Sequence, residues 1–355
     1  MNIPEVPPFQ LQELISSISE GTGLGPDVQV RCAQAHGSEI YVGCSNGELI
    51  RYALQANDPN KIASYTILSR QSLPNDKPVE EIVLLPSISR ALVLSGHSID
   101  YLADNQIHFY TLPSLDVVAS NIIKPIRHVV TFAVDHEHLI RPAQPISGTP
   151  TRPEPVEFCV IKRNAISMYS LRDRLLFQKE IPLPQGTRTL ARRSGSALCM
   201  ADSEFYNIVD LENSQMFPLL PLNQSPDIDI QVKPFITVTA PGEFLLISWT
   251  GASALGIFVN SNGDPVRGTL EWPGHPKSMC FDYPYITTLL PNDTIEIHNV
   301  DTQGIVQVVS APPEKEGDSE GTSERSALTA SMAGFLVPST QRSAKMRTVP
   351  VSLLR

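Results

Sequence analysis

Between residues 40 and 54 the chain reads Ile40-Tyr-Val-Gly-Cys44, then Ser45-Asn-Gly47, then Glu48-Leu-Ile-Arg-Tyr-Ala-Leu54. A short apolar run is followed by a polar turn and by a second run with period-two alternation, which is typical of a β-strand with one face more apolar than the other. The Asn-Gly pair predicts a type I′ turn, because this turn needs positive φ angles at both central residues. The stretch therefore predicts a β-hairpin.

The same unit recurs along the chain. The further copies are 91–94 with 107–112, 157–161 with 165–169, 197–200 with 204–209, 243–248 with 254–259, 285–290 with 294–298, and a weaker copy that begins at Gly334. Apart from one longer gap, the copies lie about 40 to 50 residues apart, which is the spacing of a four-stranded propeller blade. We therefore predict an all-β fold: a seven-bladed β-propeller of four-stranded antiparallel blades, with residues 1–355 as a single domain.

Three segments fall outside the repeat. A proline-rich stretch at 141–155 predicts a surface loop inserted in one blade, and an acidic Gly/Ser-rich stretch at 312–326 predicts a second, unstructured insertion. Because the last copy supplies only two or three strands, we expect an N-terminal strand such as Val28–Cys32 to close the ring. Apolar residues between Phe9 and Ile18 follow helical spacing. This segment is interpreted either as a short helix or as a strand packed on the propeller.

Composition limits the class of protein. The chain has 27 basic and 37 acidic side chains and a formal net charge of −10, so nucleic acid is an unfavourable partner. The five cysteines are scattered and flanked by apolar residues, which favours small core residues in a reducing compartment over a disulfide framework. No N-terminal signal pattern is present, and no apolar run reaches the roughly 18 residues of a membrane span. These features predict a cytosolic protein.

The motifs that resemble catalytic or cofactor sites are incomplete. Gly21-Thr-Gly-Leu-Gly25 lacks the glycine spacing and the following helix of a dinucleotide loop. Gly96-His-Ser98 and Ser194-Gly-Ser196 lack the strand-to-helix context of a nucleophile elbow. His136-Glu-His138 has no further ligand cluster to complete a metal site, which favours an exposed loop, and Asp227-Ile-Asp229 is interpreted as loop polarity. We predict no catalytic residue, no cofactor and no metal; a propeller hydrolase with a site in the central channel would need a cluster of acids or histidines.

One group of basic residues is denser than the rest. It consists of Arg172, Arg174, Lys179, Arg188, Arg192 and Arg193. The five arginines could bind an acidic partner surface or anionic lipid headgroups. An ordinary charged rim between two blades is the alternative and is favoured.

Several segments together resemble one known family. They are Ala254-Leu-Gly-Ile-Phe-Val-Asn-Ser-Asn-Gly-Asp-Pro-Val-Arg-Gly-Thr-Leu-Glu-Trp272, Pro276-Lys-Ser-Met-Cys-Phe-Asp-Tyr-Pro-Tyr285, Ile295-Glu-Ile-His298 and Tyr41-Val-Gly-Cys-Ser-Asn-Gly-Glu-Leu-Ile50. These stretches are similar to the hairpin motifs of citron-homology (CNH) domains. The resemblance extends over essentially the whole chain.

Within that family the sequence most resembles the N-terminal domains of endosomal (CORVET-type) tethering subunits. Vacuolar (HOPS-type) tethering subunits and the regulatory domains of Rho guanine-nucleotide exchange factors are the alternatives. The resemblance implies a non-enzymatic module that binds an early-endosomal Rab GTPase or another tether subunit and reaches endosomal or vacuolar membranes peripherally, through its partners. It also implies that an α-solenoid follows in a longer chain, while Met1 close to the first blade suggests the natural N-terminus. The family's motifs identify blade architecture, so no interface residue can be carried over.

Overall fold

The computed structural model describes residues 9–15, 28–37, 39–55, 64–74, 76–96, 105–143, 152–184, 186, 188–225, 232–311, 329–331, 334–338 and 343–348. Nearly all regular structure in these residues is β, in four-stranded antiparallel sheets. The helical elements among them are a 3₁₀ turn, η1 (Pro86–Ile88), and the one-turn helix α1 (His136–Leu139). The chain divides into two compact units, residues 82–275 and a terminal unit of residues 1–81 with 276–355.

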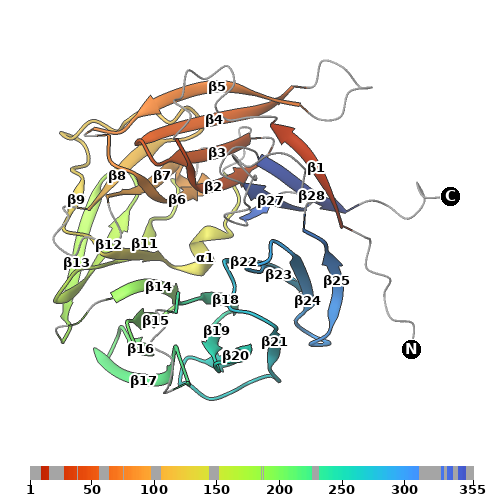
Figure 1. Ribbon diagram of the computed structural model, residues 1–355. Coiled ribbons are helices and arrows are strands. Elements are labelled where there is room, and N and C mark those ends of the chain that lie inside the picture. Colours follow the sequence, from red (N-terminus) through yellow and green to blue (C-terminus); the bar gives the residue numbers. More distant parts are fainter. Residues whose placement is uncertain are drawn as a thin grey trace. The chain divides into compact units, whose positions relative to one another are not determined.

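The 82–275 unit contains four sheets, the first of which starts a few residues before the boundary (Figure 1). Their strands are β6 (Val79–Leu85), β7 (Arg90–Ser95), β8 (Gln106–Thr111) and β9 (Ile126–Arg127); β10 (Thr131–Val134), β11 (Val156–Ile161), β12 (Ala165–Leu171) and β13 (Leu175–Pro182); β14 (Arg188–Ser194), β15 (Ala197–Asp202), β16 (Phe205–Asp210) and β17 (Gln215–Pro221); β18 (Ile236–Ala240), β19 (Glu243–Trp249), β20 (Ala254–Asn260) and β21 (Leu270–Trp272). In each sheet the spatial order of the strands is their order in the chain.

The terminal unit contains three sheets. Two follow the same consecutive plan: β2 (Val30–His36), β3 (Glu39–Cys44), β4 (Glu48–Gln55) and β5 (Ser64–Ser72); and β22 (Ser278–Asp282), β23 (Tyr285–Leu289), β24 (Ile295–Asn299) and β25 (Ile305–Val309). The third has the order β1-β28-β27-β26 and combines β1 (Phe9–Ile15) with β26 (Thr329–Ser331), β27 (Gly334–Pro338) and β28 (Ser343–Thr348).

The predicted hairpins are confirmed as the two central strands of six sheets. The hairpin at 40–54 is β3 and β4, in register from Glu39 opposite Ala53 to Gly43 opposite Leu49. In sheet β10–β13 the central strand β11 is apolar on both faces because cores lie on either side of it, whereas the fourth strand is an exposed edge. In β11 only Glu157 is not buried, while β13 is exposed over most of its length.

The turn of that first hairpin differs from the predicted type I′. Gly47 has φ +83°, but Asn46 keeps a negative φ, and the Gly47 amide donates to the Cys44 carbonyl at 3.2 Å. The loop is therefore a three-residue connection that ends in a left-handed glycine. The Asn46 side chain favours this geometry, since its Oδ1 accepts from the Glu48 amide at 3.2 Å and its Nδ2 donates to the Glu48 carboxylate at 3.0 Å.

The repeated four-stranded unit is confirmed, but six sheets rather than seven are continuous in sequence. The last repeat supplies three strands and takes its fourth, β1, from the N-terminal region, where Phe9 lies opposite Thr348. The prediction that an N-terminal strand completes the last sheet is therefore confirmed. The segment suggested for it, Val28–Cys32, is wrong, because its residues from Val30 onward belong to β2. Of the two alternatives left open for Phe9–Ile18, the strand is the one formed over Phe9–Ile15 and not the helix: β28 has an edge whose backbone groups need partners, and pairing outweighs local helical spacing.

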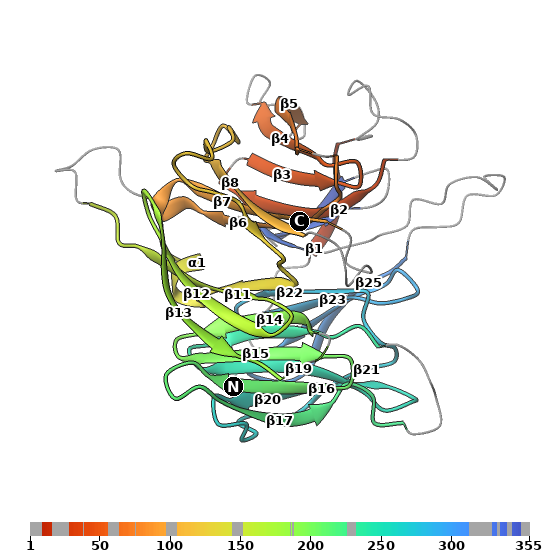
Figure 2. The same ribbon diagram turned by 90° about the vertical axis from the view of Figure 1, so that its left-hand side faces the viewer.

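Apolar cores fill the spaces between neighbouring sheets of the 82–275 unit. One joins sheets β6–β9 and β10–β13 around Phe109, Phe132 and Phe158, and two more join β10–β13 to β14–β17 and β14–β17 to β18–β21. Figure 2 shows these strands from the side. The predicted insertion at 141–155 lies partly outside the described residues, and its described ends carry no strand; the one at 312–326 lies wholly outside them.

Candidate functional site

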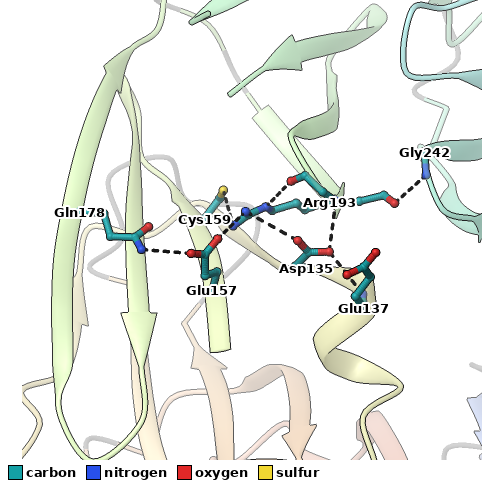
Figure 3. A network of polar contacts seen from close by, with 9 residues as sticks. Asp135, Glu137, Glu157, Cys159, Gln178, Arg193 and Gly242 are labelled. Carbon is teal, nitrogen blue, oxygen red and sulfur yellow. Dashed lines mark hydrogen bonds and ion pairs between the residues drawn. The ribbon is translucent and has the colours of Figure 1, made fainter. Parts of the chain in front are cut away.

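The most connected polar cluster of the 82–275 unit surrounds Arg193, near the end of β14 (Figure 3). Its side chain is only 6% exposed, and its Nη2 donates to Glu157 Oε2 on β11 at 2.9 Å. The same nitrogen lies 3.7 Å from Asp135 Oδ2, directly after β10. Arg193 Nε donates to the Gly195 carbonyl at 2.9 Å. A guanidinium is suited to this position, because its fixed fork of donors can bind several acceptors at once.

The cluster reaches three sheets. Asp135 Oδ1 accepts from the Gly195 amide at 3.2 Å and from the Glu137 amide at 3.3 Å, so it also caps α1. Ser194 Oγ accepts from the Gly242 amide at 2.8 Å, in the turn that joins β18 to β19. Sheets β10–β13, β14–β17 and β18–β21 are therefore joined through one short segment of β14.

The electrostatics of the cluster favour a structural role. Desolvation alone would raise the pKa of Glu157, but the hydrogen bonds from Arg193 and Gln178 lower it below its ordinary value. Burial raises the pKa of the neighbouring Cys159 thiol to about 11, so this sulfur stays protonated near neutral pH and is a poor nucleophile. The arrangement stabilises charges and presents no activated group.

The predicted basic group does not form one exposed patch. Arg193 belongs to the buried cluster, and Arg188 is also buried, with Nη1 donating to the Pro184 carbonyl at 2.7 Å. Arg192 is half-buried and donates to the Ala191 carbonyl. Arg172 and Arg174 lie in the turn between β12 and β13, where Arg172 Nε lies 3.5 Å from Asp173. Partner binding by the three that are not buried stays a prediction.

The other motifs have varied outcomes. His136-Glu-His138 forms α1 rather than the expected loop, and burial lowers the pKa of both histidines. In the part of the chain that the structure describes, no group of three potential metal ligands occurs. Ser194-Gly-Ser196 is the β14–β15 turn. The segments 21–25, 97–98 and 227–229 lie outside the described residues.

None of the five cysteines forms a disulfide. The prediction of core positions is confirmed for Cys44, Cys159 and Cys199, which are buried, whereas Cys32 and Cys280 are half-buried. Burial raises the pKa of the Cys44 thiol to about 12 and that of Cys199 further still.

A second site was missed in the sequence. An open cavity of about 660 Å³ is lined by residues of sheets β6–β9 and β10–β13 and their loops. Its basic lining residues are Lys124, Arg127, His128 and Lys162. In the sequence, the only indication of this cavity is the basic run from Lys124 to His128. Lys162 is distant in the chain and joins the cavity lining only through the packing of two sheets.

Comparison with known proteins identifies the family to which this architecture belongs. The domain has the fold of the AfRom2 CNH domain, with a TM-score of 0.57 and 18% sequence identity, covering 96% of this chain and 100% of that one. Its class is an all-β propeller built of four-stranded antiparallel blades. The CNH domain model matches residues 36–316, and the chain belongs to the CNH domain family.

Three further relatives are 22–23% identical to this chain. Vacuolar protein sorting-associated protein 3 of Saccharomyces cerevisiae is 22% identical over 309 residues, which are 82% of this chain and 26% of that protein. Its namesake in Schizosaccharomyces pombe is 22% identical over 289 residues, or 80% of this chain and 28% of that protein. Vacuolar morphogenesis protein 6 of S. pombe is 23% identical over 295 residues, which are 79% of this chain and 29% of that protein. The chain thus spans little more than a quarter of the length of these relatives.

Proposed function

We propose that this domain is a protein-interaction module of an endosomal or vacuolar membrane-tethering complex of the CORVET type. The observation that carries the proposal is the similarity to two vacuolar protein sorting-associated proteins 3 and to a vacuolar morphogenesis protein 6 over most of this chain. Because the chain matches only part of each relative, we further propose that residues 1–355 are one domain of a longer chain that continues into an α-solenoid.

We propose a role in binding rather than catalysis. The clustered carboxylates around Arg193 are held in ion pairs, and the buried thiols are kept neutral. Stacked sheets with short turns make a rigid scaffold, and such scaffolds bind partners through loops and edges without reorganising.

The proposed partner is an early-endosomal type of Rab GTPase, a neighbouring tether subunit, or both. Membrane association is then peripheral, on the cytoplasmic face of endosomes or the vacuole. In the described residues, no helix is long and apolar enough to cross a bilayer. A vacuolar tether subunit is the second candidate, favoured by the match to vacuolar morphogenesis protein 6.

A nucleotide-dependent capture experiment tests the proposal. The immobilised chain is incubated with early-endosomal, late-endosomal and Rho GTPases, each loaded with GDP or a non-hydrolysable GTP analogue, and separately with tether subunits. We expect retention of the early-endosomal GTPase only with the GTP analogue, for which the GDP form is the matched control. Retention of the late-endosomal GTPase instead supports the vacuolar subunit, and retention of a tether subunit alone supports a scaffold without GTPase binding.

Two results contradict the proposal. Selective retention of a Rho GTPase would assign the domain to a regulatory role in nucleotide exchange, and failure to retain any GTPase or tether subunit would remove the tethering role. Measurable turnover of esters or phosphoesters by the purified chain would overturn the non-enzymatic role.

A further inference from the structure

The basic cavity of the 82–275 unit collects positive charge in an acidic protein. The chain carries a net charge of −10, yet the lining includes Lys124, Arg127 and Lys162 and no carboxylate residue. Its volume of about 660 Å³ falls within the range of small-molecule sites. The composition and size together indicate a site for a small anionic group.

Two separate segments supply these cations. Lys124 is in the loop that follows β8, Arg127 is in β9, opposite Gln106, and Lys162 is in the turn between β11 and β12. Within the described part of the chain, none of the three makes an ion pair with a carboxylate. Glu180 is close enough to act on the Tyr169 hydroxyl, but it does not line the cavity, and it accepts a hydrogen bond from Ser167 Oγ at 3.0 Å. The positive charge of the cavity lining is therefore not neutralised by a carboxylate among the described residues.

A phosphate monoester is the group that fits this arrangement. It carries about −1.5 to −2 charges at neutral pH and three acceptor oxygens, so it can bind several cations at once. Ser120 adds a hydroxyl donor to the lining. A single carboxylate would neutralise fewer of the three cations.

An aromatic row, exposed at one end, adjoins the cavity. Phe158, Tyr169 and Phe177 lie opposite one another on β11, β12 and β13 and form an aromatic row across the sheet. The Phe158 and Tyr169 rings stack at 5.6 Å, and Phe177 meets Tyr169 edge-on at 5.8 Å. Tyr169 lines the cavity, and Phe177 is 58% exposed beyond it.

A second exposed apolar side chain lies on the other sheet's loop. Ile122 is 56% exposed and precedes the lining residue Lys124 by two positions. A basic site flanked by exposed aromatic and aliphatic side chains is typical of surfaces that bind a headgroup while the apolar residues enter the membrane interface. These exposed apolar side chains would contribute nothing to the binding of a soluble phosphorylated ligand.

We propose that this cavity binds the phosphorylated headgroup of a membrane lipid. Lys124, Arg127 and Lys162 contact the phosphate monoester, and Phe177 and Ile122 enter the interfacial layer of the bilayer. The domain then contacts the membrane directly, independently of the GTPase or tether subunit proposed above.

Vesicle co-flotation of the purified chain tests this proposal. The vesicles consist of phosphatidylcholine with or without a small fraction of a phosphoinositide monophosphate. We expect binding only to the doped vesicles, and a partition coefficient that falls about five-fold for each of Lys124→Gln, Arg127→Gln and Lys162→Gln. The matched control is the triple variant Arg31→Gln, Arg152→Gln and Lys233→Gln, which makes the same change in net charge elsewhere and is expected to bind as the unchanged chain does.

Two further arms separate a lipid from a soluble ligand. Phe177→Ser should weaken vesicle binding but leave the binding of a soluble inositol phosphate, measured by calorimetry, unchanged. Equal vesicle binding by the control triple variant and by a triple variant with Lys124→Gln, Arg127→Gln and Lys162→Gln together would overturn the proposal. So would binding of inositol phosphate or a phosphoserine peptide without any binding to doped vesicles. Thermal unfolding verifies that each variant is folded, and the single variants at the exposed Lys124 and Arg127 replace the triple variant if it is not.

Discussion

Arg193 on β14 donates a hydrogen bond to Glu157 on β11 at 2.9 Å and so joins two neighbouring sheets. The two residues are 36 positions apart in the chain. Arg193 also neutralises Asp135, whose side chain is 9% exposed. Without the guanidinium, Asp135 would be a buried carboxylate with no counter-charge, and such a charge is strongly destabilising.

Arg193→Met should therefore lower the free energy of unfolding by about 3 kcal/mol, the lower end of the range for breaking a buried pair, because Glu157 is partly solvated. Arg192→Met is the control on the same strand, where the half-buried arginine donates to the Ala191 carbonyl, and it should lower the free energy of unfolding by less than Arg193→Met does. Urea unfolding followed by tryptophan fluorescence measures both. Equal losses would mean that the ion pairs contribute nothing specific.

Tyr206→Phe should lower stability by about 1 to 3 kcal/mol. The buried Tyr206 hydroxyl donates to the Ile247 carbonyl at 2.7 Å and accepts from the Phe235 amide at 3.0 Å, so its removal leaves two buried backbone groups unpaired. Tyr110→Phe is the control, because that equally buried hydroxyl has no hydrogen-bond partner among the described residues. Removing it should be neutral or stabilising in the same denaturation experiment, and a loss comparable to that of Tyr206→Phe would contradict this account.

Gly47→Ala should destabilise the first hairpin more than Gly37→Ala does. Both glycines have positive φ, +83° and +57°, so each alanine carries about 1 kcal/mol of backbone strain. A Cβ at Gly47 would additionally lie 2.8 Å from the Asp76 backbone, whereas at Gly37 it would meet nothing within 4 Å. Differential scanning calorimetry of the two variants should give the lower melting temperature for Gly47→Ala. The reverse order would show that the space around Gly47 is not restrictive.

Stability should fall as the pH drops below about 6.5, partly because of His275. Burial lowers the pKa of this histidine from 6.5, and its Nδ1 is buried without a hydrogen-bond partner while Nε2 lies 2.7 Å from the Lys233 carbonyl. The unfolded chain then binds the proton more tightly than the folded chain, so the stability present above pH 6.5 is lost as the pH falls through the lower folded pKa.

In His275→Gln the fall in unfolding free energy between neutral pH and pH 5.5 should be smaller than in the unchanged chain. It should not vanish, because burial also lowers the pKa of His136 and His138. Urea titrations across this pH range give the comparison, and an unchanged slope would exclude His275 as a contributor.

The hairpins could be predicted because their signal is local. A strand such as β3 is buried from Ile40 to Cys44, so its apolar run and the following glycine identify it without knowledge of its neighbours. The segment Phe9–Ile15 could not be assigned in this way, since its structure depends on an edge supplied by Ser343–Thr348 at the other end of the chain.

The candidate sites depend still more on packing. Arg193 was interpreted as part of a charged rim because its acidic partners, Asp135 and Glu157, come from another sheet. The basic cavity was missed for the same reason, as Lys124 and Lys162 meet only through the packing of two sheets. Periodicity indicates which face of a strand is apolar, but not which distant charge lies against it.

The pairing of β1 with β28 also determines when the domain can be completed on the ribosome. Thr348 is synthesised about 340 residues after its partner Phe9, which at bacterial to eukaryotic rates is roughly 20 to 70 s later. Until then β1 has no partner strand, and the nascent chain displays an unpaired segment that chaperones or a second nascent chain could bind. The other described sheets are each encoded contiguously and can form as they emerge, so the last step in the folding of this domain pairs β1 with β28.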